Sequence, residues 1–294
     1  MTATINPPVI FDLSALPMST RLAILDDHAH QLETKGHSYW SQEPHERKGF
    51  KLFGVGNDAK TKKGEKLGVD TAILYLSPAS NATPKGETLC PSAVQAKCLK
   101  ACLYTAGRGR MSSVEMSRLY KTLMYTQLRA TFWGMLIREI NALAEKSRRA
   151  GRTLGIRING TSDLILPDWL IGCNPDVQFY DYSKNVDYYN DKSLVRRPNH
   201  HVTLSYSGAN NEYRHAVLDA AMNGHNIAVV FRNREQAEKA IAHGWLGFEC
   251  IDGDETDVRF MDPRATASGQ AGYVVALYAK GNAKADRTGF VVDY

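Results

Sequence analysis

The sequence predicts an α/β protein with a parallel sheet, a partial TIM-barrel-like architecture and an N-terminal extension. Apolar strands alternate with amphipathic helices through the second half of the chain, which is typical of βα units. Polar residues follow successive strands, as they do where parallel strands end at a ligand-binding edge. The 294 residues are 43% hydrophobic and 23% charged, an ordinary composition for a soluble chain with a full core.

The first 50 residues are expected to form an arm with one short helix near residues 19–33, ahead of an α/β domain over residues 51–294. A basic, glycine-flanked loop follows at residues 54–66, and it lacks the spacing of a phosphate-binding P-loop. This loop is interpreted as a solvated charged surface or, alternatively, as a cofactor contact made by Lys60.

The remaining elements follow from apolar periodicity. A strand is expected at residues 70–77, and a long helix from Met116 to the C-terminal signal at Gly151, with a break near Gly134. Further strands are expected at residues 153–159, 177–182, 201–206, 226–231, 247–251 and 273–279, and helices at residues 163–171, 211–223 and 235–243.

Three of the five cysteines lie in one short segment with the spacing C-x7-C-x3-C, namely Cys90, Cys98 and Cys102. Soft thiolate ligands select iron–sulfur clusters, zinc or copper(I). The spacing differs from that of common zinc knuckles, and no second cysteine pair follows. The segment is therefore interpreted as an iron–sulfur site, with a zinc site or three buried, metal-free thiols as alternatives.

The interval between Cys98 and Cys102 is about one helical turn, so both are expected on one helix face. Cys90 precedes Pro91 and is expected to be extended. Three ligands leave one position open for chemistry or for an external ligand. The basic loop at Arg108 and Arg110 would offset the charge of a thiolate-bound cluster. Cys173 and Cys250 are interpreted as core thiols, either of which could be a fourth ligand.

Polar residues follow the predicted strands at Asn159–Asp163, Ser183–Lys184, Ser207–Gly208 and Arg232–Asn233. Asn159 and Ser207 are candidates for cofactor binding. Asp163 is a candidate catalytic residue, although helix capping explains it equally well. Lys184 is the stronger catalytic candidate, because a basic residue is unfavourable at a helix N-terminus.

Two further patterns have mainly structural explanations. His200 and His201 could bind a metal, but histidines beside a strand are more often only hydrogen-bonded. The acidic stretch at residues 250–263 lacks the full calcium-loop pattern. It is expected to hold an Asp–Arg buttress in which Arg259 pairs bidentately with a carboxylate.

The chain carries a formal net charge of +5, which permits contact with nucleic acid without requiring it. No run of about 18 apolar residues predicts a membrane span, and the first residues lack the pattern of a secretory signal. With an odd number of cysteines, these features predict a cytoplasmic protein.

Several segments together resemble the phage-borne gene-product-88-like family. They are the cysteine run, the long helix after it, and the residues at 156–163, 179–184, 250–263 and 276–283, with the 60–65 loop and the 73–78 strand. The resemblance implies a bacteriophage or prophage source and an iron–sulfur centre at Cys90, Cys98 and Cys102. Localisation is then expected in the host cytoplasm.

Three cysteines ahead of a βα sheet also resemble radical S-adenosylmethionine enzymes. Those enzymes typically use C-x3-C-x2-C, and their glycine-rich cosubstrate segment is not evident in this chain. The architecture is therefore expected to be shared, whereas S-adenosylmethionine is the less favoured cosubstrate.

The leading hypothesis is a phage-encoded [4Fe–4S] protein that acts as a redox or radical-type enzyme. The cysteine segment lies between the strand at residues 70–77 and the long helix, so chain order places it at the carboxyl edge of the sheet. Its open iron would bind a small molecule there, beside Asp163 and Lys184. The alternative is a non-enzymatic protein with a structural cluster, whose basic surface binds host nucleic acid or a host protein.

Overall fold

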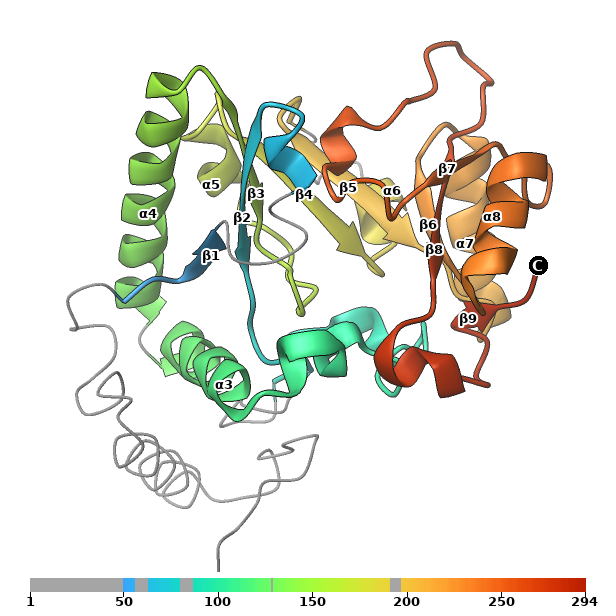
Figure 1. Cartoon of the computed structure of the whole chain (residues 1–294), viewed down its shortest axis with the longest axis horizontal. Coiled ribbons are helices and arrows are strands. Elements are labelled where there is room, and N and C mark those ends of the chain that lie inside the picture. The colour runs from blue at the N-terminus through green and yellow to red at the C-terminus, as the bar shows by residue number, and fades with distance from the viewer. Residues whose placement is uncertain (1–49, 56–62, 80–86, 128, 191–196) are drawn as a thin grey trace, which may run out of the picture.

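A computed structural model describes residues 50–55, 63–79, 87–127, 129–190 and 197–294 (Figure 1). Their core is a sheet of nine strands in the order β1-β2-β3-β4-β5-β6-β8-β7, with β9 paired to β6. All pairs are parallel except β1 with β2. The strands are β1 (Phe53–Val55), β2 (Val69–Leu74), β3 (Thr153–Arg157), β4 (Gln178–Ser183), β5 (His200–Ser205), β6 (Ile227–Phe231), β7 (Cys250–Asp252), β8 (Val274–Tyr278) and β9 (Val291–Val292).

The predicted α/β class and the parallel sheet are confirmed. Within the described part of the chain, β1 and β7 end the sheet and do not pair with each other. The sheet is therefore open, and the expected barrel-like architecture is not confirmed. The expected arm at residues 1–50, with its helix, lies outside the described residues except for Phe50.

Helices cover one face of the sheet and bury its apolar side chains. They are α4 (Arg129–Arg149), α5 (Asp168–Gly172), α6 (Asp187–Asn190), α7 (Asn211–Met222) and α8 (Arg234–His243). Ile156 and Phe179 belong to the core that includes α4 and α5 residues. Val229 and Ala276 belong to the core that includes α7 and α8 residues. These apolar contacts supply the main stabilisation of the fold.

The opposite face of the sheet is filled by a loop with the short 3-10 helix η6 (Arg259–Met261). Phe260 packs edge-on against Tyr180, with ring centroids 5.7 Å apart. Gly155 allows this approach, because a Cβ at that position would lie 2.9 Å from the Phe260 ring. Arg157, two residues after Gly155 on β3, pairs with Asp257 of the same loop at 3.0 Å.

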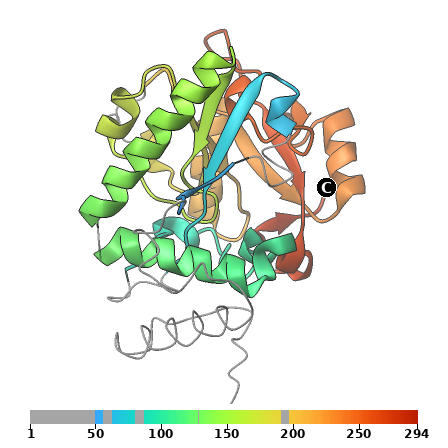
Figure 2. The same cartoon turned by 60° about the vertical axis from the view of Figure 1, so that its left-hand side comes forward.

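The predicted long helix is two helices. α3 (Ser112–Gln127) ends before residue 128, and α4 begins at Arg129, so the expected break near Gly134 is wrong. Figure 2 shows α3 lying crosswise below the sheet, whereas α4 runs along its side. Periodicity did not reveal the change of direction, because both helices carry apolar residues at helical spacing.

The predicted helix at residues 163–171 begins only at Asp168. Pro167 precedes it in extended conformation, and Pro167 disfavours helix at the residue before it. The segments β1, α6 and β9 were not predicted, since each has only two to four residues and too little periodicity to detect.

Strands β5 and β6 diverge, and β9 fills the gap at their carboxyl ends. β6 pairs with β8 along its whole length, so β5 and β9 share its other edge. β5 pairs there with Ile227 and Ala228, and β9 pairs with Val230 and Phe231. The amide of Gly208, after β5, donates to Gly289 at 2.8 Å. The C-terminal segment is therefore part of the carboxyl edge.

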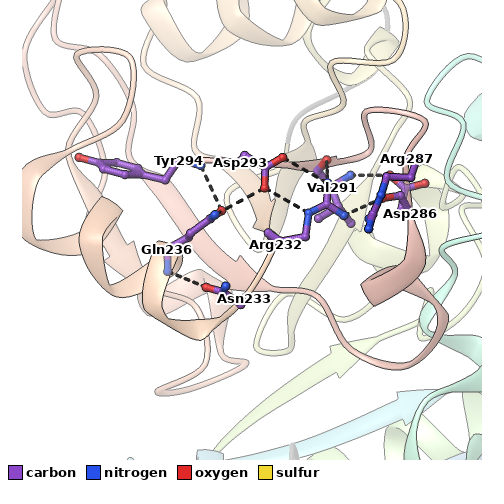
Figure 3. Close-up of polar contacts among 8 residues, drawn as sticks. All are labelled: Arg232, Asn233, Gln236, Asp286, Arg287, Val291, Asp293 and Tyr294. Atoms are coloured by element: carbon purple, nitrogen blue, oxygen red, sulfur yellow. Dashed lines mark hydrogen bonds and ion pairs between the residues drawn. The ribbon is translucent and has the colours of Figure 1, made fainter.

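A set of polar contacts holds this C-terminal segment on the sheet (Figure 3). The Arg232 guanidinium, at the end of β6, donates to the Asp286 and Val291 carbonyl oxygens and pairs with Asp293 at 3.2 Å. Gln236 on α8 accepts from the Tyr294 amide at 3.1 Å. These contacts satisfy backbone groups that a two-residue strand leaves unpaired.

Candidate metal centre at the carboxyl edge of the sheet

The cysteine segment, residues 90–102, consists of turns. It begins with the 3-10 helix η3 (Pro91–Ala93) and leads into η4 (Leu103–Thr105) and η5 (Gly107–Arg110). Cys98 and Cys102 therefore do not share a helix face, and that prediction is wrong. The physical reason is Lys97, whose φ of 48° is incompatible with a right-handed helix. The Cys98 amide closes the turn by donating to the Ala93 carbonyl oxygen at 3.3 Å.

Hydrogen bonds hold the cysteine segment at the carboxyl ends of the parallel strands. The Asp163 amide, after β3, donates to the Leu89 carbonyl oxygen at 2.8 Å. The Ser207 hydroxyl, after β5, donates to the Ala96 carbonyl oxygen at 2.8 Å. This confirms the edge at which chain order placed the segment, where parallel α/β sheets bind ligands.

Two backbone positions beside the cysteines have unfavourable conformations. Ala79 and Lys97 have φ angles of 51° and 48°, a region that favours glycine. Among the described residues, Leu246 is the third non-glycine residue with positive φ. Such conformations typically persist where function requires them, at a cost of about 1–3 kcal/mol each. In this conformation the Ala79 amide donates a hydrogen bond to the Cys90 sulfur at 3.4 Å.

The three thiols have different immediate partners. The Cys90 sulfur accepts from the Ala79 amide, and the Cys102 sulfur accepts from the Tyr104 amide at 3.5 Å. The Cys98 thiol donates to the Ala93 carbonyl oxygen at 4.0 Å. Amide donors stabilise thiolates, and hydrogen bonds to sulfur tune metal–sulfur centres. Two of the three sulfurs therefore already have the contacts of a thiolate ligand.

Burial raises the pKa of the Cys90 thiol to about 12, opposed by the Ala79 amide and reinforced by Asp163. Burial also raises the pKa of Cys98, and Lys184 opposes this shift more than any other group. The Cys102 charge contributes to both shifts. The three sulfurs, Asp163 and Lys184 therefore lie within electrostatic reach of one another. Without a metal, Cys90 and Cys98 are neutral thiols at pH 7.

Lys184 supplies positive charge to this group of sulfurs from the end of β4. Burial would lower its pKa, but the charges that Cys98 and Asp163 carry when ionised outweigh burial and raise it. In the described part of the chain, no hydrogen bond or ion pair of its ammonium group is found, and its backbone amide donates to Asp163 at 2.9 Å. An ammonium held among sulfurs with no fixed partner is suited to an anionic group.

Asp163, Asn159 and Ser207 lie at the same edge, but their side chains are bonded within the protein. Asp163 accepts from the Ser183 hydroxyl at 2.7 Å and from the Lys184 amide. The Asn159 side chain donates to Leu164 and Asp181 and accepts from Ser162 and Leu164. These bonds fix the loop that positions Lys184 and Leu89. The catalytic role of Asp163 and the cofactor-binding roles of Asn159 and Ser207 stay predictions.

The other candidate residues lie elsewhere. Arg108 is on η5 with an exposed side chain, and Lys60 lies outside the described residues. Cys173 is exposed at the end of α5, and Cys250 is on the edge strand β7. His201 is hydrogen-bonded to Gln178, the ordinary alternative to a metal ligand. The expected bidentate pairing of Arg259 is instead a single contact with Asp262 at 3.4 Å.

Arg118 on α3 is a buried cation that the sequence did not reveal. It donates to the Tyr104 carbonyl oxygen at 2.9 Å and lies over the rings of Tyr104 and Tyr75, at 4.9 and 5.5 Å. Burial lowers its pKa, opposed by Tyr104, Tyr75 and Cys102. Its position among the other polar residues of α3 gave no signal, because only the crosswise packing of α3 turns it toward Cys102.

Glu115, one turn before Arg118, gives a pH-dependent prediction. Burial raises its pKa from 4.5 to about 7, and Arg118 opposes the shift. When a carboxyl group has a higher pKa in the folded than in the unfolded protein, its contribution to stability is fully present below the unfolded-state pKa. That contribution is lost as the pH rises through the folded-state pKa. We therefore expect Glu115→Gln to raise the unfolding temperature at pH 8, with the gain vanishing toward pH 4.5. Equal gains at both pH values would contradict this prediction.

No three Cys, His, Asp or Glu side chains within the described ranges are arranged as a ready site for one metal ion. None of the described helices is long and apolar enough to cross a membrane.

Fold and site together define an open, mostly parallel α/β protein with a cysteine-bearing cap on its carboxyl edge. The sequence model of the family described as Gene product 88 matches residues 51–294. The chain therefore belongs to the Gene product 88 family, which bears out the family resemblance and supports the expected phage source. No curated protein and no solved structure matches the chain.

Proposed function

We propose that the chain is an iron–sulfur protein in which Cys90, Cys98 and Cys102 hold a [4Fe–4S] cluster with one open iron. The single observation that carries the proposal is the grouping of three thiols with Lys184 at the carboxyl edge of a parallel sheet. Such a cluster supplies electron transfer or an open coordination position when bound. The proposed activity is redox or radical-type chemistry on a small molecule at that edge.

The donor set favours a cluster over one ion. A single metal ion needs its ligands around one point, and the described side chains offer no such arrangement. In a four-iron cluster each thiolate binds a different iron, so the sulfurs need not converge. Amide donors to Cys90 and Cys102, with the charges of Lys184 and Arg118 nearby, suit an anionic sulfur centre.

Lys184 and Asp163 have distinct proposed tasks. The Lys184 ammonium would bind an anionic group of the substrate beside the open position. Asp163, a residue that is 3% exposed, holds the Lys184 backbone through its carboxylate and so fixes the place from which the ammonium extends. S-adenosylmethionine is a less favoured ligand, since the cysteine spacing differs from that of the enzymes that use it.

The test is anaerobic purification with iron and sulfide quantification and electron paramagnetic resonance of the reduced protein. We expect about four irons and four sulfides per chain, the stoichiometry of this cluster type. Small carboxylates and S-adenosylmethionine are then added, and each is expected to change the spectrum only if it reaches an open iron. Stoichiometric zinc without iron or sulfide, in protein produced with an ample supply of iron, would refute the proposal.

Lys184→Met is expected to lower the reduction potential of the cluster. Reduction adds negative charge, which a nearby ammonium stabilises and a thioether does not. Lys184→Arg, which keeps the charge, is the matched control and should retain most of the potential. Potentials are compared by redox titration at equal iron content. An unchanged potential in Lys184→Met would show that the ammonium does not act on the cluster.

The second candidate function is a structural cluster in a protein that binds a partner. The cysteine segment and its continuation expose four large apolar side chains, Val94, Leu99, Leu103 and Met111. Lys97, Lys100 and Arg108 are exposed among them in the sequence. Exposed apolar groups with a basic rim are typical of an interaction surface. The proposed partner is host nucleic acid or a host protein, and under this alternative no small ligand changes the cluster spectrum.

A further inference from the structure

A cavity of about 590 Å³ lies along β5, and its lining includes neither the cysteines nor Asp163 or Lys184. It opens because β6 pairs with β5 only from Leu204 onward. On that edge, the residues His200–Thr203 pair with no strand in the described part of the chain. A cavity of this volume is the usual size for a small-molecule site.

The cavity lining carries an excess of positive charge. It includes three arginines, Arg197, Arg259 and Arg264, and one carboxylate, Asp168. Arg197 and Asp168 bind each other through two hydrogen bonds, so their charges cancel. Arg259 lies 3.4 Å from the Asp262 carboxylate, so Arg264 is the lining arginine that has no ion pair within the described residues.

Arg259 is almost fully buried, at 2% exposure. Its Nη1 lies 3.4 Å from the Asp262 carboxylate, but neither atom completes a hydrogen bond there. Its Nε also has no hydrogen-bond partner among the described residues. A buried donor left unpaired costs about 1–3 kcal/mol. Such donors beside a cavity indicate a missing acceptor.

Arg264 lies at the mouth of the cavity and is held there by a histidine. Its Nη2 contacts the His201 Nδ1, and the His201 Nε2 lies 2.8 Å from the Gln178 side-chain oxygen. A guanidinium can only donate, so Nδ1 must accept and Nε2 carries the proton that Gln178 receives. The hydrogen bonds from Gln178 through His201 therefore orient the Arg264 guanidinium. No carboxylate in the described ranges pairs with Arg264.

His200 adds another unpaired group to the wall. Its Nε2 is buried without a hydrogen-bond partner in the described part of the chain. Burial lowers the pKa of His200 to about 4, and Asp168 opposes the shift. The ring is therefore neutral at pH 7, and the two arginines remain the source of positive charge.

The rest of the lining is apolar and aromatic. Leu166 and Ile171 are both buried core residues at this wall. Tyr188 also lines the cavity, and its ring packs edge-on against His200 at 5.7 Å. A ligand that fits must therefore combine an anionic end with an apolar or aromatic body.

We propose that this cavity binds a phosphate monoester with an aromatic body, its phosphate held by Arg264 and Arg259 and its ring against Leu166, Ile171 and Tyr188. Arginine is the side chain best suited to phosphate, because its planar donors match the phosphate oxygens in pairs. The site is separate from the proposed cluster and does not depend on it.

The test is calorimetric titration of the full-length protein with phenyl phosphate, inorganic phosphate and benzoate. Wild type is compared with Arg264→Gln and with Arg234→Gln, at equal metal content. Arg234 is the matched control, because it lies on α8, pairs with Glu238 and is not part of the cavity. Arg264 has an exposed side chain, so its variant is expected to fold.

Phenyl phosphate is expected to bind wild type and Arg234→Gln equally, and Arg264→Gln at least about tenfold more weakly, or about 1.4 kcal/mol. Inorganic phosphate should bind more weakly than phenyl phosphate, since it lacks the ring. Three results would overturn the proposal: no binding to wild type, an equal loss in both variants, or benzoate binding as tightly as phenyl phosphate.

Discussion

Cys98→Ala is expected to reduce bound iron to background and to lower stability by more than about 4 kcal/mol. Loss of a bound metal centre is one of the few single changes that reach this size, because metal binding is coupled to folding. The segment around Cys98 consists of 3-10 helices and turns and has little core of its own. Without its centre it retains the packing of small buried residues such as Ala96 and Ala101 and the hydrogen bonds of Leu89, Ala96 and Lys97 to the sheet edge.

The measurements are iron content, visible absorption and the midpoint of chemical denaturation. Cys173→Ala is the matched control, since Cys173 is exposed at the end of α5 and is far along the chain from the segment. It should keep wild-type iron and stability. If Cys98→Ala kept full iron content, the three-cysteine centre would be wrong even though the fold remained correct.

Arg157→Met is expected to destabilise the protein by about 3–5 kcal/mol, the usual cost of removing one partner from a buried ion pair. Arg157 is 5% exposed, pairs with Asp257 at 3.0 Å and lies 4.8 Å from the centre of the Tyr182 ring. Methionine keeps much of the volume but leaves the Asp257 carboxylate without this partner in a buried site.

The control is the double variant Arg157→Met with Asp257→Leu. Removing both charges eliminates one of the two carboxylates that Arg157 balances, the other being Asp181 at 4.0 Å, so part of the lost stability should return. Urea unfolding gives the free energies for the wild type, the two single variants and the double variant. If Arg157→Met cost less than about 1 kcal/mol, the pair would be an exposed or dispensable contact, contrary to its burial.

The same ion pair shows how far local patterns reach. The strand at residues 153–157 and the acidic stretch at residues 250–263 were both recognised in the sequence. Nothing in either segment indicated that Arg157 and Asp257, 100 positions apart, meet inside the protein. The sequence predicted that Arg259 pairs with a carboxylate, and it contacts Asp262 at 3.4 Å, whereas Asp257 pairs with Arg157 of β3.

The candidate site was likewise only partly predictable from the sequence. Chain order predicted that the cysteine segment lies at the carboxyl edge with Asp163 and Lys184, since right-handed βα connections leave little other choice. It did not predict the turn conformation around Cys98, which depends on the positive φ of Lys97. Nor did it predict Arg118, whose burial depends on how α3 packs.

The sequence by itself determined the α/β class, most strands and helices of the second half, the cysteine segment and the family. These depend on periodicity, spacing and residue type, which are local properties. Only the tertiary structure decided that the sheet stays open, that β9 enters between β5 and β6, and that a basic cavity lies along β5. Those features arise from contacts between segments far apart in the chain, whose pairing depends on packing and burial.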